Sequence, residues 1–418
     1  MRPNLYRGRH PINADAFGPV EFSEVFRTAD DMREKYLDRK IRPLLKYFLL
    51  RDGEPLSFQL IMSPSTRTAI SFQTSIRVMG GIYDWKPDIM SSLSKGESAK
   101  SMATILGYFE CCDCIIVRYD EDDYAAQKMA DAIEDRGLSP IVIDAGSGTR
   151  SHVTQMFLDM YTYYRWRPKE FYTGDITYAF IGDLSHSRTI HSDLKGLENF
   201  GGTVYLVGPE AENVPSEYLP SSENTRLRIY KVTDPLAIAD KVDAWYFTRS
   251  QDNLRKKKKT TGDRKSSAFS EAYWATKKLR DAMKKDAIVL HPLPHGPEFE
   301  EDIDLIDHRF QHFPQALNGI FVRMALLKML FAPHVDIKQI ASEYGKVEMS
   351  GYFHSIPVNT KNIIGLCCTE NCLCVELRGN GWEGKLQSKQ EKLKVKAENP
   401  IIPWTFCNHT HCQQVSVK

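Results

Sequence analysis

The sequence lacks long hydrophobic runs. No stretch of its 418 residues approaches the roughly 18 consecutive apolar residues that span a membrane. The first residues, MRPNLYRGRHPINAD, also lack the apolar core of a secretory signal peptide. We therefore expect a cytoplasmic protein with no membrane partner.

An excess of one charge is missing too. The chain has 55 basic and 54 acidic residues and a net charge of +1, which argues against a general affinity for nucleic acids or anionic surfaces. The exception is the run Arg255-Lys256-Lys257-Lys258-Lys259, which we interpret as part of a solvated loop. A nucleic-acid-binding module is the weakest alternative, because the C-terminal tail lacks interleaved aromatic residues and a basic excess.

Cysteine is scarce outside the tail. Cys111, Cys112 and Cys114 lie in an apolar stretch, where we expect buried, unreactive thiols. The other six of the nine cysteines fall within the last 52 residues, and this clustering favours a metal site over disulfides.

Four of the six tail cysteines form two pairs, Cys367 with Cys372 and Cys407 with Cys412, and each pair is separated by the same number of residues. Two such pairs can surround a structural Zn²⁺ tetrahedrally. The alternative is a set of reduced thiols without metal. The predicted ligands are Cys367, Cys372, Cys407 and Cys412, with Cys368, Cys374, His409 and His411 as substitutes.

Apolar residues are plentiful and are arranged in alternating patterns. They make up 42% of the chain, enough for two or three packed domains. Strand-like runs alternate with helical patterns at 123–136, 152–166 and 188–200, which is typical of an α/β protein with parallel sheets. The strands are expected at 57–62, 114–119, 140–146, 178–183, 203–209, 244–248 and 287–292.

We expect two parallel-sheet α/β domains plus a small C-terminal β-rich domain. The first domain covers residues 1–150 and is completed by a helix at 318–333. The second covers 151–317, and the tail forms a third at 350–418.

Residues that bind anions follow the first predicted strand. In SPSTRTAISF, Ser65 is a good helix N-cap, and Arg67 and the hydroxyls of Thr66 and Thr68 are further donors. A helix N-terminus with these side chains suits a phosphate group.

Basic and polar residues also lie at or just after the carboxyl ends of the other predicted strands. They are Arg118, His152, Thr154, Gln155, Arg188, His191, Arg249, Gln251 and His291, with Pro292 and Leu293 following His291. Because ligands of open parallel sheets bind at the carboxyl ends of the strands, the arginines and histidine at these positions predict one polyanion site.

Together these segments resemble the aspartate carbamoyltransferase catalytic chains. The motifs SPSTRTAISF, SSLSKGES, VRYD, HVTQ, IGDLSHSRTIHS, YFTRSQ, HPLP and NGIFVRMALL occur in that family's order over roughly residues 5–333. Ornithine carbamoyltransferases resemble the chain less, because they have His-Cys-Leu-Pro where this chain has HPLP. The resemblance implies carbamoyl transfer from carbamoyl phosphate to L-aspartate in pyrimidine biosynthesis, with no catalytic metal or organic cofactor.

The resemblance also implies roles for the predicted residues. Ser65, Thr66, Arg67 and Thr68 would bind the phosphate, and Thr68, Arg118 and His152 the carbonyl oxygen. The carbamoyl nitrogen would meet Gln155 and the backbone carbonyls of Pro292 and Leu293. The aspartate carboxylates would bind Arg188, Arg249 and Gln251.

Two further features of the resemblance concern assembly. Ser92 and Lys95 of SSLSKGES match a loop that enters the neighbouring subunit's site, which implies a homotrimer with shared sites. The tail resembles the zinc domain of the family's regulatory chains, but residues 335–350 leave no room for their nucleotide-binding domain. We expect the zinc domain to join subunits of one or more trimers.

Three residues depart from the family pattern. Ala69 and His295 stand where arginine is common, and Val153 replaces a proline. None is a direct catalytic donor in this interpretation, although Ala69 and His295 lower the local positive charge and so bear on loop closure and aspartate affinity. The alternatives are a carbamoyltransferase for another amine acceptor and a non-catalytic scaffold homologue.

Overall fold

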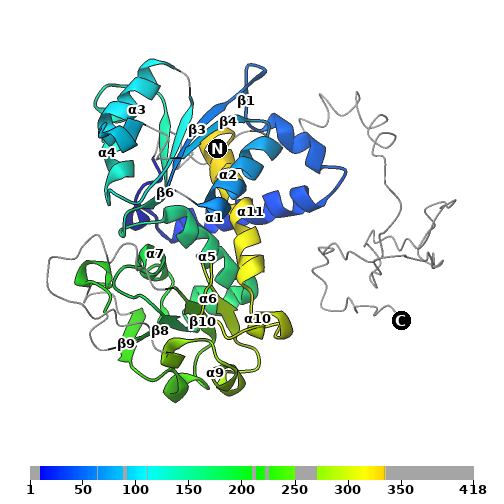
Figure 1. Ribbon diagram of the computed structural model, residues 1–418. Helices are drawn as coiled ribbons and strands as arrows, with labels where there is room; N and C mark the ends of the chain where they lie inside the picture. Colours follow the sequence, from blue (N-terminus) through cyan, green and yellow to red (C-terminus); the bar gives the residue numbers. More distant parts are fainter. Residues whose placement is uncertain are drawn as a thin grey trace, which may run out of the picture. The chain divides into compact units, whose positions relative to one another are not determined.

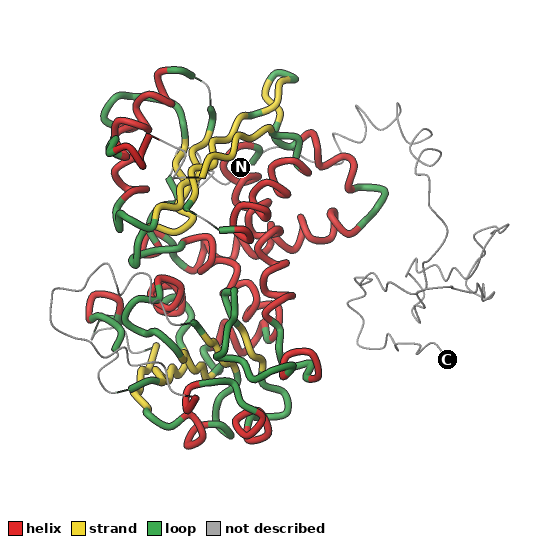
Figure 2. Tube along the Cα trace, in the orientation of Figure 1, coloured by secondary structure: helices red, strands yellow, loops and turns green. Residues whose placement is uncertain are grey.

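The computed structural model describes residues 10–63, 65–87, 92–110, 112–209, 213–221, 226–249, 271–333 and 335. The chain separates into two compact units, Met1–Ala341 and Ser342–Lys418. The second unit, with the predicted β-rich domain and all the predicted zinc ligands, lies outside the described residues. The first unit contains two parallel sheets with helices packed around them (Figures 1 and 2).

The first sheet has the strand order β4-β3-β5-β6, and all its pairs are parallel. Its central strands are almost wholly buried, as expected when helices cover both faces. The strands are β3 (Ser57–Met62), β4 (Ile82–Pro87), β5 (Cys114–Tyr119) and β6 (Ile141–Ser147), and the helices of this part are α1 (Pro19–Leu37), α2 (Thr66–Val78), α3 (Ala99–Tyr108) and α4 (Ala125–Glu134).

The second sheet has the order β11-β10-β7-β8-β9 and is also parallel throughout. Its strands are β7 (Thr177–Ile181), β8 (Gly202–Val207), β9 (Leu227–Val232), β10 (Ala244–Phe247) and β11 (Ile288–Leu290). Its helices include α6 (Pro168–Thr173), α7 (Arg188–Leu197), α9 (Lys277–Ala282) and α10 (Ile303–Ile306). A separate antiparallel pair joins β1 (Leu50–Arg51) to β2 (Glu54–Pro55).

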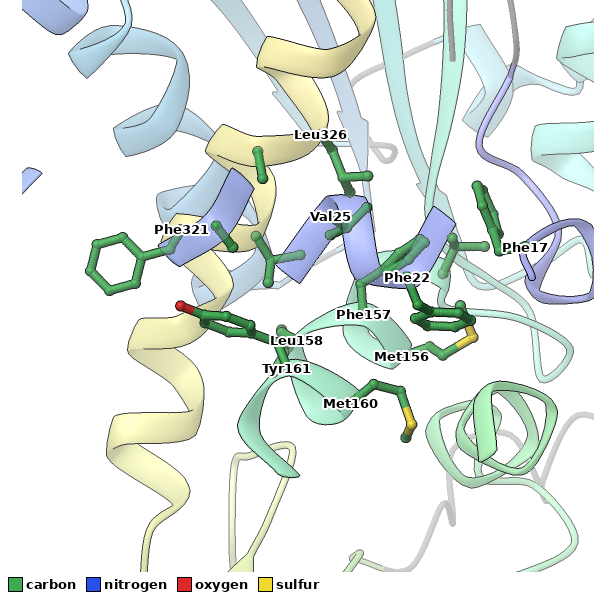
Figure 3. Close-up of a cluster of buried hydrophobic side chains, with 14 of the residues drawn as sticks. Phe17, Phe22, Val25, Met156, Phe157, Leu158, Met160, Tyr161, Phe321 and Leu326 are labelled. Atoms are coloured by element: carbon green, nitrogen blue, oxygen red, sulfur yellow. The ribbon is translucent and has the colours of Figure 1, made fainter. Parts of the chain in front are cut away.

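Two long helices connect the sheets. Helices α5 (Val153–Trp166) and α11 (His312–Phe331) pack against each other between the two sheets (Figure 1). Helix α11 begins six residues before the predicted start at 318. In Figure 3, side chains of α1, α5 and α11 meet in one apolar cluster, where the ring centroids of Phe22 and Phe157 lie 4.9 Å apart. This packing fixes α5 and α11, whose first turns face the candidate site.

The prediction of two parallel-sheet α/β units is confirmed, but two edge strands were missed. β4 contains Asp84, Lys86 and Pro87, and in β9 only Leu227 is buried, whereas Arg228 and Lys231 are exposed. Polar residues and proline are common on edge strands and weaken the strand signal in a sequence. Cys112 and Cys114 are buried free thiols, as predicted, and Cys111 lies outside the described residues. No helix in the described part of the chain has the length and apolar character needed to cross a membrane.

Candidate active site

In each sheet the strand order reverses at one strand, because later strands are added on both sides of it. In the first sheet β3 lies between β4 and β5, and in the second β7 lies between β10 and β8. Open parallel sheets bind ligands at the carboxyl end of such a strand. The segment after β3 begins α2 at Ser65–Thr68, and the segment after β7 begins α7 at Arg188.

These segments line one cavity of about 430 Å³. Eleven of the fourteen predicted substrate-binding residues contribute to its wall, including residues from both sheets. They are Ser65, Thr66, Arg67, Thr68, Arg118, His152, Gln155, Arg188, Arg249, Pro292 and Leu293.

Three predicted residues are not in that wall. Ser92 and Lys95 lie on a short 3₁₀ helix, Ser92–Lys95, outside the cavity, and Lys95 is exposed. Gln251 lies outside the described residues, as does the lysine run at 255–259.

The three departures from the family pattern also lie off the cavity wall. Ala69 and Val153 are buried in the apolar core, and His295 lies beyond the lining residues of the loop after β11. The cavity keeps the four predicted arginines, Arg67, Arg118, Arg188 and Arg249.

Positive charge dominates the cavity. Arg67, Arg118, Arg188, Arg249 and Arg323 line it, whereas Asp120 is the one carboxylate among its described lining residues. Burial, followed by the charge of Arg188, lowers the pKa of Arg118 to about 9. Burial and Arg249 lower the pKa of Arg67. An anionic ligand would relieve this mutual repulsion, so the cavity is suited to a polyanion.

The N-terminus of α2 offers further donors. Ser65 is the N-cap with φ −154° and ψ 92°, and its hydroxyl makes no capping hydrogen bond. This leaves the hydroxyl available to a ligand beside the backbone N–H groups of the first turn. Since α2 is 13 residues long, its dipole adds to the attraction of an anion.

His152 is held neutral at the start of α5. Burial first, and then Arg118, Arg188 and Arg323, hold its pKa well below the ordinary value of 6.5. Its backbone N–H donates to Ser192 Oγ at 3.0 Å, while Nδ1 has no hydrogen-bond partner within the described part of the chain. A neutral imidazole with an unused nitrogen can donate to a ligand without giving up a net proton.

The amide of Gln155 is oriented by a buried carboxylate. Nε2 donates to both oxygens of Asp159 at 3.1 Å, which leaves Oε1 as an acceptor at the cavity wall. Gln315 Nε2 and the Tyr246 hydroxyl also donate to Asp159. Gln315 Oε1 in turn accepts from the backbone N–H of His291 at 2.9 Å, so one carboxylate organises two sides of the cavity.

Sequence reasoning missed several residues of this site. Three of them lie within helices and not at the ends of strands, where donors were expected: Asp159, Gln315 and Arg323. The detectable signal was charge in an apolar run: Arg323 is only 3% exposed, donates to Thr154 Oγ1 at 3.2 Å and lies over the Phe72 ring. A buried charge in such a helix indicates a partner or a ligand.

Known proteins share this architecture. The sequence model of the carbamoyl-P binding domain of aspartate/ornithine carbamoyltransferases matches residues 9–165, and that of the Asp/Orn binding domain matches residues 174–330. The aspartate carbamoyltransferase catalytic subunit of Archaeoglobus fulgidus is 35% identical over 325 residues, covering 76% of this chain and 98% of that protein. The chain belongs to the aspartate carbamoyltransferase family. The catalytic subunit from Methanothrix thermoacetophila is 29% identical over 78% of this chain and 99% of its own length.

Solved structures of aspartate carbamoyltransferases agree. The Trypanosoma cruzi enzyme in complex with N-(phosphonacetyl)-L-aspartic acid superimposes with a TM-score of 0.67 at 27% identity, covering 78% of this chain and 97% of that one. The catalytic subunit from M. jannaschii gives a TM-score of 0.63 at 28% identity, with coverages of 78% and 98%. The region matched by the two family models ends at residue 330, before the cysteine-rich tail.

Proposed function

We propose that this chain transfers the carbamoyl group of carbamoyl phosphate to the amino group of L-aspartate, giving N-carbamoyl-L-aspartate and phosphate. The observation that carries the proposal is the cavity itself. In it, both sheets present anion donors near the strand at which the strand order reverses. Both substrates are anions, and their placement side by side converts a bimolecular step into one within a complex.

The phosphate is assigned to the mouth of α2. Ser65, Thr66, Arg67 and Thr68 surround this end of the cavity and offer hydroxyl, guanidinium and backbone donors. An arginine fork matches two phosphate oxygens at once. The departing phosphate accepts the proton of the attacking amine, so the chain needs no separate strong base.

The carbonyl oxygen is assigned to Arg118, His152 and Thr68. Negative charge grows on this oxygen as the amine attacks, and donors already aimed at it typically contribute about 3–4 kcal/mol each. The neutral state of His152 makes it a hydrogen-bond donor to the oxygen, so no covalent intermediate is required.

The carbamoyl nitrogen is assigned to Gln155 and to the backbone carbonyls of Pro292 and Leu293. Because the amide nitrogen of Gln155 donates to Asp159, the amide oxygen is the group left to accept from the ligand. Three acceptors around one NH₂ group select a carbamoyl group over an acetyl group, which has no hydrogens to donate.

The two carboxylates of aspartate are assigned to Arg188, Arg249 and Gln251. Arg188 and Arg249 follow β7 and β10 of the second sheet. The first domain, 1–150 with helix 318–333, then holds carbamoyl phosphate, and the second, 151–317, holds aspartate. Apolar residues at these positions would favour another amine acceptor, and loss of a key donor would favour a non-catalytic scaffold, whereas both arginines are present.

A homotrimer completes the site in this proposal. Lys95 is exposed and lies outside the cavity of its own chain, so it is available to a neighbouring subunit together with Ser92. Mixing two inactive variants, Lys95→Ala and Arg67→Ala, tests this: shared sites restore part of the activity in mixed trimers. If mixtures stay inactive although the trimers exchange subunits, each site is contained in one chain.

The tail is assigned a structural Zn²⁺ bound by Cys367, Cys372, Cys407 and Cys412. The support is the pair spacing, and the metal would supply folding energy that so short a segment lacks. The zinc domain would join subunits. Removal of zinc with a chelator should lower the mass measured by light scattering, and an unchanged mass would contradict this role.

A bisubstrate analogue tests the proposed function as a binding event. N-(phosphonacetyl)-L-aspartate, which the T. cruzi enzyme binds, carries both anionic ends on one molecule. Calorimetry should show binding to the purified protein, weakened at least about tenfold by Arg67→Ala and by Arg249→Ala. No binding to a folded protein would favour the scaffold alternative.

A further inference from the structure

A second cluster of reactive side chains lies just outside the cavity. His295 follows the lining residues of the loop after β11, Asp304 lies on α10, and His312 begins α11. One ligand atom from each lies within 4.8 Å of the other two, and among the described residues this is the one group of three potential metal ligands.

The distances within the cluster match a metal site. Asp304 Oδ2 lies 3.5 Å from His295 Nε2 and 3.2 Å from His312 Nε2. Zinc binds histidine nitrogen and carboxylate oxygen at about 2.0–2.2 Å, so neighbouring ligands of a tetrahedral ion lie about 3.3–3.5 Å apart. Both observed separations are close to that edge length.

The ring nitrogens of His312 have no hydrogen-bond partner besides the nearby Asp304 among the described residues. The His312 side chain is fully buried, and although Nε2 lies near Asp304, neither ring nitrogen makes a well-formed hydrogen bond within the described part of the chain. A buried imidazole without a hydrogen bond is costly unless something binds it.

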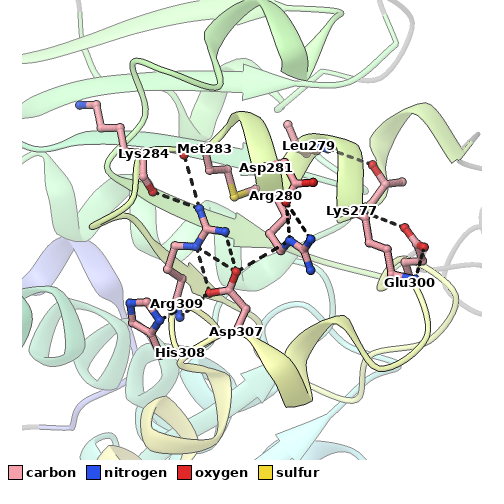
Figure 4. Close-up of polar contacts among 11 residues, drawn as sticks. Lys277, Leu279, Arg280, Asp281, Met283, Lys284, Glu300, Asp307, His308 and Arg309 are labelled. Carbon is pink, nitrogen blue, oxygen red and sulfur yellow. Dashed lines mark hydrogen bonds and ion pairs between the residues drawn. The ribbon is translucent and has the colours of Figure 1, made fainter. Parts of the chain in front are cut away.

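The surroundings hold the three ligands in place. The His295 ring stacks on Phe299 with centroids 5.0 Å apart, and Phe299 also contacts the ring of His312. Between α10 and α11, Asp307 accepts from Arg309 Nε at 3.0 Å, and Arg309 Nη1 donates to the backbone carbonyl of Lys284 at 3.2 Å (Figure 4). These contacts hold in place the segment that joins α10, with Asp304, to α11, with His312.

We propose that His295, Asp304 and His312 bind a divalent transition-metal ion of the zinc class. Two imidazoles and one carboxylate form a ligand set suited to Zn²⁺ or Co²⁺, and water completes the coordination on the side of His295, whose side chain is 32% exposed. The ion joins the loop after β11 to α11 and so ties the cavity segment Pro292–Pro294 to the helix that carries Gln315.

The affinity should be moderate. Ligating histidines usually donate their second ring N–H to an acceptor, and Nδ1 of His312 has none among the described residues. Loss of such a contact weakens metal binding about 10–100-fold relative to a fully supported site.

Cobalt binding to the full-length protein tests the proposal. The metal-free protein and the variants His295→Ala, Asp304→Asn and His312→Gln are dialysed against Co²⁺, and bound metal is counted per chain. His308→Ala is the matched control, because His308 is exposed and lies in the same segment outside the cluster. Visible absorption separates this ion, bound by nitrogen and oxygen, from any ion bound by tail thiolates, which adds intense sulfur-to-metal bands.

We expect each cluster variant to bind one Co²⁺ fewer per chain than the wild type, with the weak bands lost and any thiolate bands retained. His308→Ala should match the wild type. Equal metal content and equal spectra in the wild type and the folded variants would overturn the proposal. If His312→Gln does not fold, His295→Ala still decides the question, because His295 is partly exposed.

Discussion

Arg188 Nη1 donates to Asp120 Oδ1 at 2.8 Å, joining the start of α7 to the segment after β5 across the cavity. The same nitrogen donates to the backbone carbonyl of Gly148 at 2.8 Å. An arginine assigned to a substrate carboxylate thus already has a carboxylate of the chain beside it. On the proposed assignment, aspartate would compete with Asp120 for Arg188, which would link substrate binding to rearrangement between the two sheets.

Replacing Asp120 should strengthen aspartate binding. In Asp120→Asn the competing charge is removed, and we expect KM for aspartate to fall about threefold, roughly 0.7 kcal/mol for a partly exposed pair. Steady-state kinetics at saturating carbamoyl phosphate provide the measurement.

Asp122→Asn is the control for this change, because Asp122 pairs with Lys128 at 2.7 Å and does not line the cavity. It should leave KM unchanged. A rise of KM in Asp120→Asn would show that Asp120 positions Arg188 instead of competing for it.

His152 should act as a neutral donor at every working pH. Since burial keeps its pKa well below 6.5, the imidazole is uncharged on both sides of that value. His152→Ala should lower kcat about 10²–10³-fold, and the pH profile of kcat should keep its shape. A wild-type inflection near pH 6.5 that disappears in the variant would instead identify His152 as a titrating base.

Asp159 should matter as a positioning residue although it does not line the cavity. Asparagine at this position presents an amide where Gln155, Gln315 and Tyr246 need an acceptor. We expect Asp159→Asn to lower kcat about 10²-fold through misplacement of these groups. In Asp193→Asn, which makes the same substitution at the neighbouring carboxyl, kcat should stay within about threefold, because no side chain of the cavity wall bonds to Asp193 in the described part. Equal losses in both variants would point to a general packing defect.

The same carboxyl pair should make stability depend on pH. Burial raises the pKa of Asp159 to about 7, and burial with the charge of Asp159 raises that of Asp193 well above 3.8. The folded protein therefore holds protons that the unfolded chain has released. This contribution is fully present below about pH 4 and is lost as the pH rises through about 7.

Asp193→Asn should remove part of that loss. The melting temperature of the variant minus that of the wild type should become larger as the pH rises from about 5 to about 7, and calorimetry or circular dichroism would measure it. A constant difference between the two proteins over this interval would contradict the assignment of the buried protons.

Much of the site was predictable because its donors lie near the carboxyl ends of strands. Ser65–Thr68 and Arg249 come just after strands, Arg118 lies near the end of β5, and Arg188 begins the helix that follows β7. Parallel strands bring their carboxyl ends together. The sequence also showed the two sheets, since central strands are continuous apolar runs.

Other parts of the site depend on contacts that no local pattern reveals. Gln315 donates a hydrogen bond to Asp159, which is 156 residues away in the sequence. Asp159 lies in α5, a helix that is buried on nearly all sides. Edge strands β4 and β9 carry charges that conceal their periodicity. The proposed sharing of sites between subunits would involve surfaces that a single chain leaves exposed, such as that around Lys95.

The most direct test of the proposed function is carbamoyl transfer from carbamoyl phosphate by the purified protein, with aspartate and ornithine as acceptors in parallel. The cationic cavity predicts N-carbamoyl-L-aspartate from aspartate and no citrulline from ornithine, whose side chain carries an amine in place of the second carboxylate. Product from ornithine, or none from either acceptor with a folded protein that forms trimers, would contradict it.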